Sequence, residues 1–145
     1  MIQTIDNPAY SCGMEQACIQ EIIDLHKFFQ DWFDGTSPKT DAVFARFEKT
    51  TTPSFVLVSP DGSLAHRTEL APALYAGHAT RPTGKIWVTD AHVLHSLGNQ
   101  VVMAYQEWQT NDGVQTRRQS TAIFGVDPST PNGVHWVHVH ETWIT

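Results

Sequence analysis

Residues 134–144 read VHWVHVHETWI, the most strand-like run in the chain. Valine, isoleucine, threonine and tryptophan favour the pleated, half-buried surface of a sheet. Because side chains alternate along a strand, the run divides into two rows. One row holds Trp136, His138, His140 and Thr142, and the other holds His135, Val137, Val139, Glu141 and Trp143. Two imidazoles and an indole in one row are unusual for plain core, so this predicted central strand also carries candidate functional groups.

The composition excludes several classes of protein. The chain has 145 residues, enough for one domain with a real core. Its net charge is −6 with only nine Lys and Arg, so nucleic acid is not an expected partner. No apolar run is long enough to cross a membrane, and the first residues lack the pattern of a signal peptide. Cys12 and Cys18 have no CxxC spacing, which favours reduced thiols and a cytoplasmic protein.

Helical periodicity dominates the first half of the chain. Residues 1–13 contain Pro8 and no periodicity, so they are predicted to be an arm before a single domain over 14–145. Apolar residues spaced by three and four from about 13 to 33 predict a long amphipathic helix. A short helix is expected over 41–48, capped by Thr40, and a third over 69–76, capped by Thr68. Between them, residues 54–59 predict a strand that ends in the Pro60-Asp61-Gly62 turn.

Four strands are predicted in the second half, over 85–95, 101–110, 115–126 and 134–144. Residues 97–100 and 111–113 form short hairpin connections, of which Asp112-Gly113 is the stronger signal. Successive hairpins make an antiparallel sheet, and the long helix must cover one of its faces. The predicted fold class is therefore α+β, with a strongly bent antiparallel sheet around a long N-terminal helix. Such a cone encloses a natural pocket.

The ending VHVHET at 137–142 resembles the terminal strand of the NTF2-like superfamily, also called cystatin-like or SnoaL-like. The resemblance is closest to the DUF4440 group and to the association domain of calcium/calmodulin-dependent kinase II. Residues 91–94 with 102–109, residues 119–124, and residues 55–62 with the following helix also resemble that group's elements. The match extends roughly over residues 14–144 in element order, and it implies the cone-shaped fold.

The superfamily hosts many functions, so the resemblance must be read residue by residue. In the ketosteroid isomerases the general base is a carboxylate before the proline of the first-strand turn. Here Ser59 precedes Pro60, and a serine hydroxyl cannot abstract a carbon-bound proton unaided. Gln106 and Ala122 occupy the places that resemble the pocket arginines of the kinase association domain. The resemblance therefore implies neither isomerase chemistry nor the binding of an acidic peptide.

The candidate site follows from strand parity together with the resemblance, which implies that certain rows face the cavity. Trp108 and Trp136 would supply apolar walls, and the polar positions are Gln106, Arg118, Ser120, His138, His140 and, from the long helix, His26. His138 and His140 are the candidate catalytic residues, as acid/base imidazoles. Packing in an ordinary core or on a sheet surface is the alternative for each residue. We expect a small, flat, largely apolar ligand with one or two polar atoms, and rejection of highly charged molecules.

No metal or other cofactor is predicted. His138 and His140 could ligate a metal together, with His92 or Glu107 as a third ligand, but no spacing enforces this set. The chain contains no GxSxG, HExxH or glycine-rich phosphate loop.

Two function classes stay open. The first is a binding or assembly domain with a pocket in the cone. The alternative is a lyase- or isomerase-type enzyme, similar to the dehydratases and SnoaL-like cyclases, that uses histidine acid/base chemistry. In either case the uncovered sheet face, with Val137, Val139 and Trp143, predicts a homodimer through the sheet.

Overall fold

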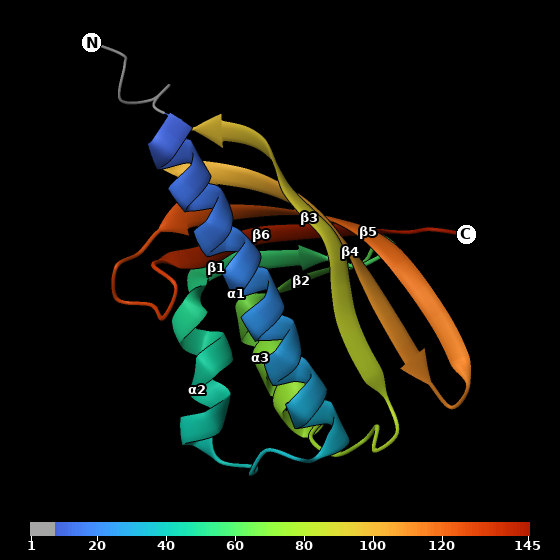
Figure 1. Cartoon of the computed structure of the whole chain (residues 1–145). Coiled ribbons are helices and arrows are strands. Elements are labelled where there is room, and N and C mark those ends of the chain that lie inside the picture. Colours follow the sequence, from blue (N-terminus) through green and yellow to red (C-terminus); the bar gives the residue numbers. More distant parts are fainter. Residues whose placement is uncertain (1–7) are drawn as a thin grey trace.

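Figure 1 presents a computed structural model in which residues 8–145 are described, with side chains described from residue 13 onward. Three helices cover one face of a six-stranded sheet, and the long helix runs diagonally across it. The predicted α+β class, with its long N-terminal helix, is confirmed. Within the described chain, no helix is long and apolar enough to cross a membrane.

Helix α1 (Pro8–Asp34) supplies most of the core on the helical side. Its predicted stripe is present, because Cys18, Ile22, Leu25 and Trp32 are all buried. The helix begins earlier than the sequence indicated, since residues 8–13, expected in the arm, form its first turns; residues 1–7 lie outside the described part of the chain. The Cys18 thiol is free, and burial, with Glu21 and Glu15, raises its pKa to about 12.

Helices α2 (Asp41–Thr50) and α3 (Arg67–Ala76) flank α1. The Thr40 hydroxyl caps α2 as predicted, accepting a hydrogen bond from the Val43 amide at 3.2 Å. Helix α3 begins before the expected cap at Thr68. The Glu69 carboxylate reaches back and accepts from the His66 amide at 3.0 Å, which moves the start of the helix to Arg67.

The sheet has the order β2-β1-β6-β5-β4-β3. Its strands are β1 (Thr51–Val58), β2 (Leu64–His66), β3 (Lys85–Leu97), β4 (Gln100–Asn111), β5 (Val114–Val126) and β6 (Val134–Trp143). The antiparallel pairs β3–β4, β4–β5 and β5–β6 were expected. The sheet is mixed, because β1 pairs with β6 in parallel, and the three-residue strand β2 was not predicted.

The tight turn between β4 and β5 has the chemistry that the sequence predicted. Asp112 and Gly113 adopt φ values of 52° and 80°. Positive φ at both central residues is the mark of a type I′ hairpin turn, whose twist matches that of the strands.

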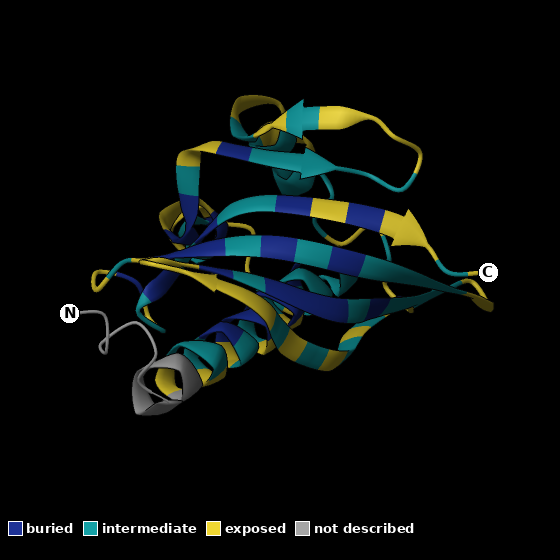
Figure 2. Cartoon of the chain, turned by 90° about the horizontal axis from the view of Figure 1, so that it is seen from above, coloured by how far each residue is buried: buried dark blue, intermediate teal, exposed yellow. Residues whose placement is uncertain are grey.

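Register irregularities occur in three strand pairs, β1–β6, β3–β4 and β5–β6. The pairing of β3 with β4 shifts between Thr89 and His92, where Asp90 has φ 58°. The pairing of β5 with β6 shifts between Ile123 and Phe124, so that Trp136 and His138 face successive residues of β5. A bulge places two residues opposite one and increases the local twist. Figure 2 shows the resulting alternation of buried and less buried positions along the strands.

Candidate functional site

A cavity of about 200 Å³ lies between α1, α3 and the inner face of the sheet. Most of its lining is apolar, from aromatic rings and from leucine, isoleucine and valine side chains. The rings belong to Phe29, Phe33, Phe47, Phe55, Tyr105 and Trp136. A concave, mostly apolar cavity with a few convergent polar groups is the usual form of a small-molecule site.

The polar lining comes from six side chains on α1, the α3–β3 loop, β4, β5 and β6. They are His26, Arg81, Glu107, Gln109, Arg118 and Glu141. Cross-strand neighbours share a face of the sheet, and the pairing of Glu107 with Arg118 brings two of these side chains together. Three of the six are basic and two are acidic.

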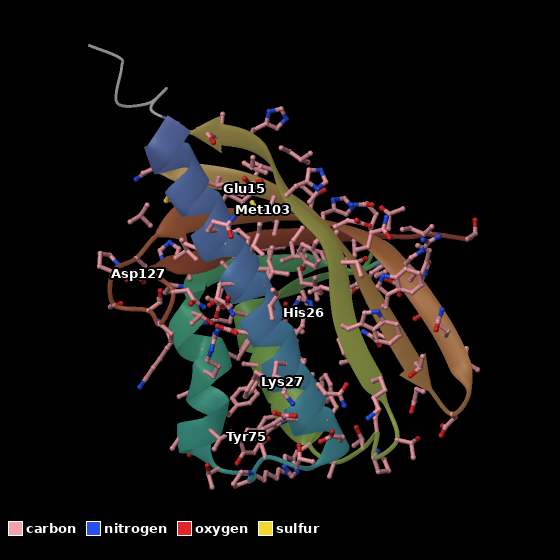
Figure 3. The ribbon with its side chains drawn as sticks, in the orientation of Figure 1. Glu15, His26, Lys27, Tyr75, Met103 and Asp127 are labelled. Carbon is pink, nitrogen blue, oxygen red and sulfur yellow. The ribbon has the colours of Figure 1, made fainter. Side chains whose placement is uncertain are left out.

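His26 and Glu107 form a buried ion pair. His26 lies about halfway along α1, beside the strands (Figure 3). Its Nε2 lies 3.0 Å from Glu107 Oε1, and its Nδ1 lies 2.7 Å from the Ile22 carbonyl oxygen. The Ile22 carbonyl can only accept, so Nδ1 donates to it, and with Glu107 ionised Nε2 donates as well, which describes an imidazolium facing a carboxylate. Burial alone would lower the pKa of His26, but the Glu107 carboxylate raises it above the usual value.

The ion pair continues as a chain of hydrogen bonds toward the α3–β3 loop. Gln109 Nε2 donates to Glu107 Oε2 at 2.6 Å, and Arg81 Nη1 donates to Gln109 Oε1 at 3.1 Å. Burial opposes ionisation of Glu107, but His26, Arg118 and Gln109 together lower its pKa. Glu107 is therefore held as a carboxylate whose oxygens both have partners.

Glu141 is the second buried carboxyl group. Arg118 Nη1 donates to its Oε1 at 3.1 Å. Burial, followed by the negative charge of Glu107, raises the pKa of Glu141 to about 7, although Arg118 and His26 oppose the shift. Two carboxyl groups in one cavity thus have pKa values displaced in opposite directions, a pattern typical of acid/base sites.

Two polar atoms beside this pair have no hydrogen-bond partner within the described part of the chain. They are Arg118 Nε and the Ser120 hydroxyl, both fully buried. Ser120 pairs across the strands with Tyr105 and Glu141 on the inner face. A buried donor without a partner is costly, by ~1–3 kcal/mol, and it marks a place where a ligand or water can bind.

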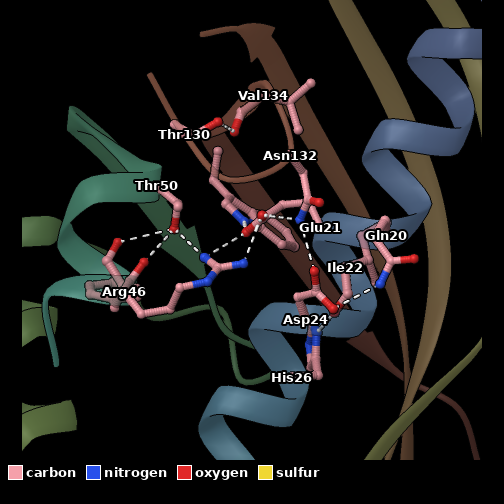
Figure 4. Close-up of polar contacts among 12 residues, drawn as sticks. Gln20, Glu21, Ile22, Asp24, His26, Arg46, Thr50, Thr130, Asn132 and Val134 are labelled. Carbon is pink, nitrogen blue, oxygen red and sulfur yellow. Dashed lines mark hydrogen bonds and ion pairs between the residues drawn. The ribbon is translucent and has the colours of Figure 1, made fainter. Parts of the chain in front are cut away.

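A second polar network is centred on Glu21 of α1 and holds the indole of Trp136 in place; Figure 4 shows its polar contacts. The Glu21 carboxylate is wholly buried and accepts from both terminal nitrogens of Arg46, at 2.8 and 3.0 Å. It also accepts from Asn132 Nδ2 at 3.0 Å and from Trp136 Nε1 at 2.8 Å. The indole of Trp136 is therefore positioned by α1, α2 and the β5–β6 loop together.

The structure brings together only some of the residues that the sequence singled out. His26, Arg118 and Trp136 line the cavity, and Ser120 lies on the inner face just behind it. Gln106, Trp108, His138 and His140 do not line it. For these four residues, the predicted cavity-facing position differs from the one observed.

A bulge in β6 explains why His138 and His140 lie outside the cavity. Trp136 pairs with Phe124, and His138 already pairs with Ile123, so Val137 is the extra residue. One extra residue moves all later side chains to the other face. Trp136, Val139 and Glu141 consequently point inward, while His138 and His140 line an open groove on the outer face with Ile123 and Val102.

The resemblance implied that the row of β4 with Gln106 and Trp108 faces the cavity. In the structure this row lies on the outer face of the sheet. Trp108 stacks between two cross-strand neighbours, the indole of Trp87 at 5.9 Å and the guanidinium of Arg117 at 4.8 Å. The row of Tyr105, Glu107 and Gln109 faces inward in their place. Strand alternation alone places these three residues on one face, but only the pairing partners reveal which side that face is on.

The structure separates the metal ligands that the sequence considered. His138 and His140 are on the outer face, and Glu107 is on the inner face. Among the described residues, no group of three or more His, Cys, Asp or Glu side chains could hold a metal ion.

We expected the pocket to reject highly charged ligands, because the sequence indicated no cluster of basic groups there. Arg81 and Arg118 both line the cavity, together with His26. Their presence removes the reason for excluding an anion. Glu141 and Arg81, which sequence reasoning did not select, are as central to the polar wall as the residues it did select.

An α+β cone with a cavity on the inner face of its sheet defines a class of proteins, and solved structures confirm that class as NTF2-like. An NTF2-like protein of unknown function from Pseudomonas aeruginosa is 25% identical, with a TM-score of 0.80 over 89% of this chain and 99% of that chain. The S. rosetta CaMKII hub is 16% identical, with a TM-score of 0.67 over 89% of this chain and 95% of that chain. The superfamily suspected from the VHVHET ending is thereby confirmed.

Within that class, residues 18–145 match the family described as sucrose-6-phosphate phosphohydrolase C-terminal, and the chain belongs to this family. Sucrose-phosphatase 2 of Nicotiana tabacum is 22% identical over 139 residues, which cover 92% of this chain and 32% of that protein. Sucrose-phosphatase 1 of the same plant is similar to the same extent. The chain spans about a third of the length of these relatives.

Proposed function

We propose that this protein binds a small molecule in the cavity of the cone. The observation that carries the proposal is the unequal lining of the cavity. Aromatic and aliphatic side chains make up most of it, and the polar side chains include His26, Glu107, Arg118 and Glu141. A ligand with an apolar body and one polar end matches such a lining. A volume of about 200 Å³ is small for a ligand pocket, which favours a compound with a single ring.

The names of the plant relatives specify a sugar phosphate. A sugar phosphate is polar over its whole surface, whereas six aromatic rings line this cavity. The chain also matches only about a third of those proteins. We therefore propose a less polar ligand for this chain.

The test is a screen of single-ring compounds by ligand-observed NMR, with dissociation constants from titration calorimetry. Leu70 of α3 lines the cavity, and Leu70→Trp should fill it and abolish binding. Val114 lies on the exposed β4–β5 hairpin, so Val114→Trp is the matched control and should bind as the wild type does. If Leu70→Trp does not fold, Leu70→Phe takes its place as the variant with a filled cavity. Equal binding by the filled variants, or no binding by the wild type, would overturn the proposal.

Acid/base catalysis of the lyase or isomerase type is the second candidate. The observation that favours it is the pair of carboxyl groups with oppositely displaced pKa values beside an imidazolium. Glu141, not His138 or His140, would then be the acid/base group. Proton NMR of each bound compound after incubation in D2O would reveal exchange or conversion, and Glu141→Gln should abolish either.

We also propose that two copies associate through the outer face of the sheet. The helices pack on the inner face only (Figure 2). The outer groove contains Val102, Ile123, His138 and His140 and no carboxylate. Two such faces can meet without repulsion between acidic groups, despite the net charge of −6.

A further inference from the structure

We propose that the polar end of the ligand is a carboxylate, which Arg118 binds while Glu141 takes up a proton. This inference rests on the proposed binding function and names the ligand class and the proton linkage of that same cavity. It is carried by the geometry around the Arg118 guanidinium, by the fixed state of Glu107, and by the environment of Glu141.

Arg118, a residue of the cavity lining, has an unused donor. Its Nη1 donates to Glu141, but its Nε is buried and has no acceptor within the described part of the chain. The guanidinium is a planar fork that binds a carboxylate through two parallel hydrogen bonds. A single contact to Glu141 at 3.1 Å leaves this capacity partly unused. A ligand carboxylate beside Nε would satisfy the buried donor.

Glu107 cannot take the proton, because its surroundings hold it in the charged form. Its Oε1 lies 3.0 Å from His26 Nε2, its Oε2 accepts from Gln109, and these neighbours with Arg118 lower its pKa. Protonation of Glu107 would leave the imidazolium facing a neutral partner inside the protein. Of the two carboxyl groups in the cavity, Glu141 is therefore the one whose charge can change.

The charged and titratable groups that face Glu141 come from three elements. They are His26 on α1, Tyr105 and Glu107 on β4, and Arg118 on β5. Burial and Glu107 already raise the pKa of Glu141 to about 7. A ligand carboxylate beside Arg118 adds a second negative charge and competes for the same guanidinium. Both effects favour protonated Glu141, which can in turn donate a hydrogen bond to the ligand.

The lining of the cavity favours a ligand with a single anionic group. Its charged side chains are His26, Arg81, Glu107, Arg118 and Glu141. The remaining walls are aromatic and aliphatic, and they offer no donors to a second charge. A monoanionic aromatic acid therefore fits the cavity better than a phosphate dianion.

The experiment compares benzoate and phenylacetate with their neutral amides, benzamide and phenylacetamide. Calorimetry in two buffers of different ionisation enthalpy gives the number of protons taken up per ligand. We expect each acid to bind at least about tenfold more tightly than its amide. Proton uptake should approach one per ligand at pH 8 and become small below pH 6, because Glu141 is then already protonated.

Two variants separate the two roles. Glu141→Gln mimics the protonated carboxyl group, so it should bind the acids without proton uptake and with little dependence on pH. Arg118→Gln should lose the preference for acid over amide. Arg118→Lys retains the charge but not the fork, and it serves if Arg118→Gln does not fold, as judged by circular dichroism.

The outcomes distinguish this inference from the proposed function. If amides bind as tightly as acids, the inference fails and the binding function stands. If acids bind without proton uptake by the wild type at pH 8, or if Glu141→Gln takes up protons like the wild type, the proton linkage is overturned. If no single-ring compound binds, both proposals fail.

Discussion

At the scale of single residues, Glu141 links the stability of the fold to pH. Its folded pKa of about 7 lies above the ordinary value of 4.5. A carboxyl group of this kind contributes stability that is fully present below its unfolded pKa and is lost as pH rises through the folded pKa. The wild type must therefore lose stability between about pH 4.5 and 7 through this group, in contrast to a surface carboxylate.

We expect Glu141→Gln to become more stable relative to the wild type as pH rises from 5 to 8. The gain should be of the order of 1–3 kcal/mol, because one pKa unit corresponds to about 1.4 kcal/mol and the carboxyl group is largely buried. Urea unfolding at pH 5, 6.5 and 8 measures the difference. Glu48→Gln, at an exposed position of α2, is the control. A difference between variant and wild type that stays constant over this range would contradict the assignment.

At the scale of elements, the faces of β4 and β6 give Trp108 and Trp136 different environments. Trp136 is almost fully buried, and its ring packs 4.4 Å from Phe124. Trp108 lies half-buried on the outer face in its stack with Trp87 and Arg117. Only Trp136 contributes to both the core and the cavity wall.

Trp136→Ala should therefore lower the free energy of unfolding by about 3–5 kcal/mol, the usual cost of truncating a buried aromatic side chain. Trp108→Ala should cost only about 1 kcal/mol, the scale of a cross-strand pair. Binding of a cavity ligand should weaken in Trp136→Phe and stay unchanged in Trp108→Phe. Chemical denaturation measures both losses, and similar values for the two alanine variants would count against the assignment of faces.

At the scale of the whole molecule, the uncovered outer face determines the expected assembly. The chain has a mass of 16.2 kDa, so light scattering at micromolar concentration should give about twice that value. Ile123→Asp places a carboxylate in the groove of the outer face and should yield a monomer. Val114→Asp, on the hairpin, should leave the mass unchanged. A monomeric wild type would exclude the proposed dimer.

Much of the fold could be predicted from sequence because its signals are local. The stripe of α1 and the type I′ turn at Asp112 and Gly113 each depend on residues within a few positions of one another. The Thr40 cap is equally local. The alternation within β4 was also visible, since Tyr105, Glu107 and Gln109 form one row on any straight strand.

Only the tertiary structure decided which row faces the cavity and which partners meet there. A single extra residue at Val137 separates Trp136 from His138 and His140, and no local pattern announces it. The pairing of β1 with β6, and of His26 with Glu107 far along the chain, depends likewise on long-range register. The physical reason is that side chains on a strand alternate with a period of two, so a shift of one residue in pairing exchanges the two faces completely.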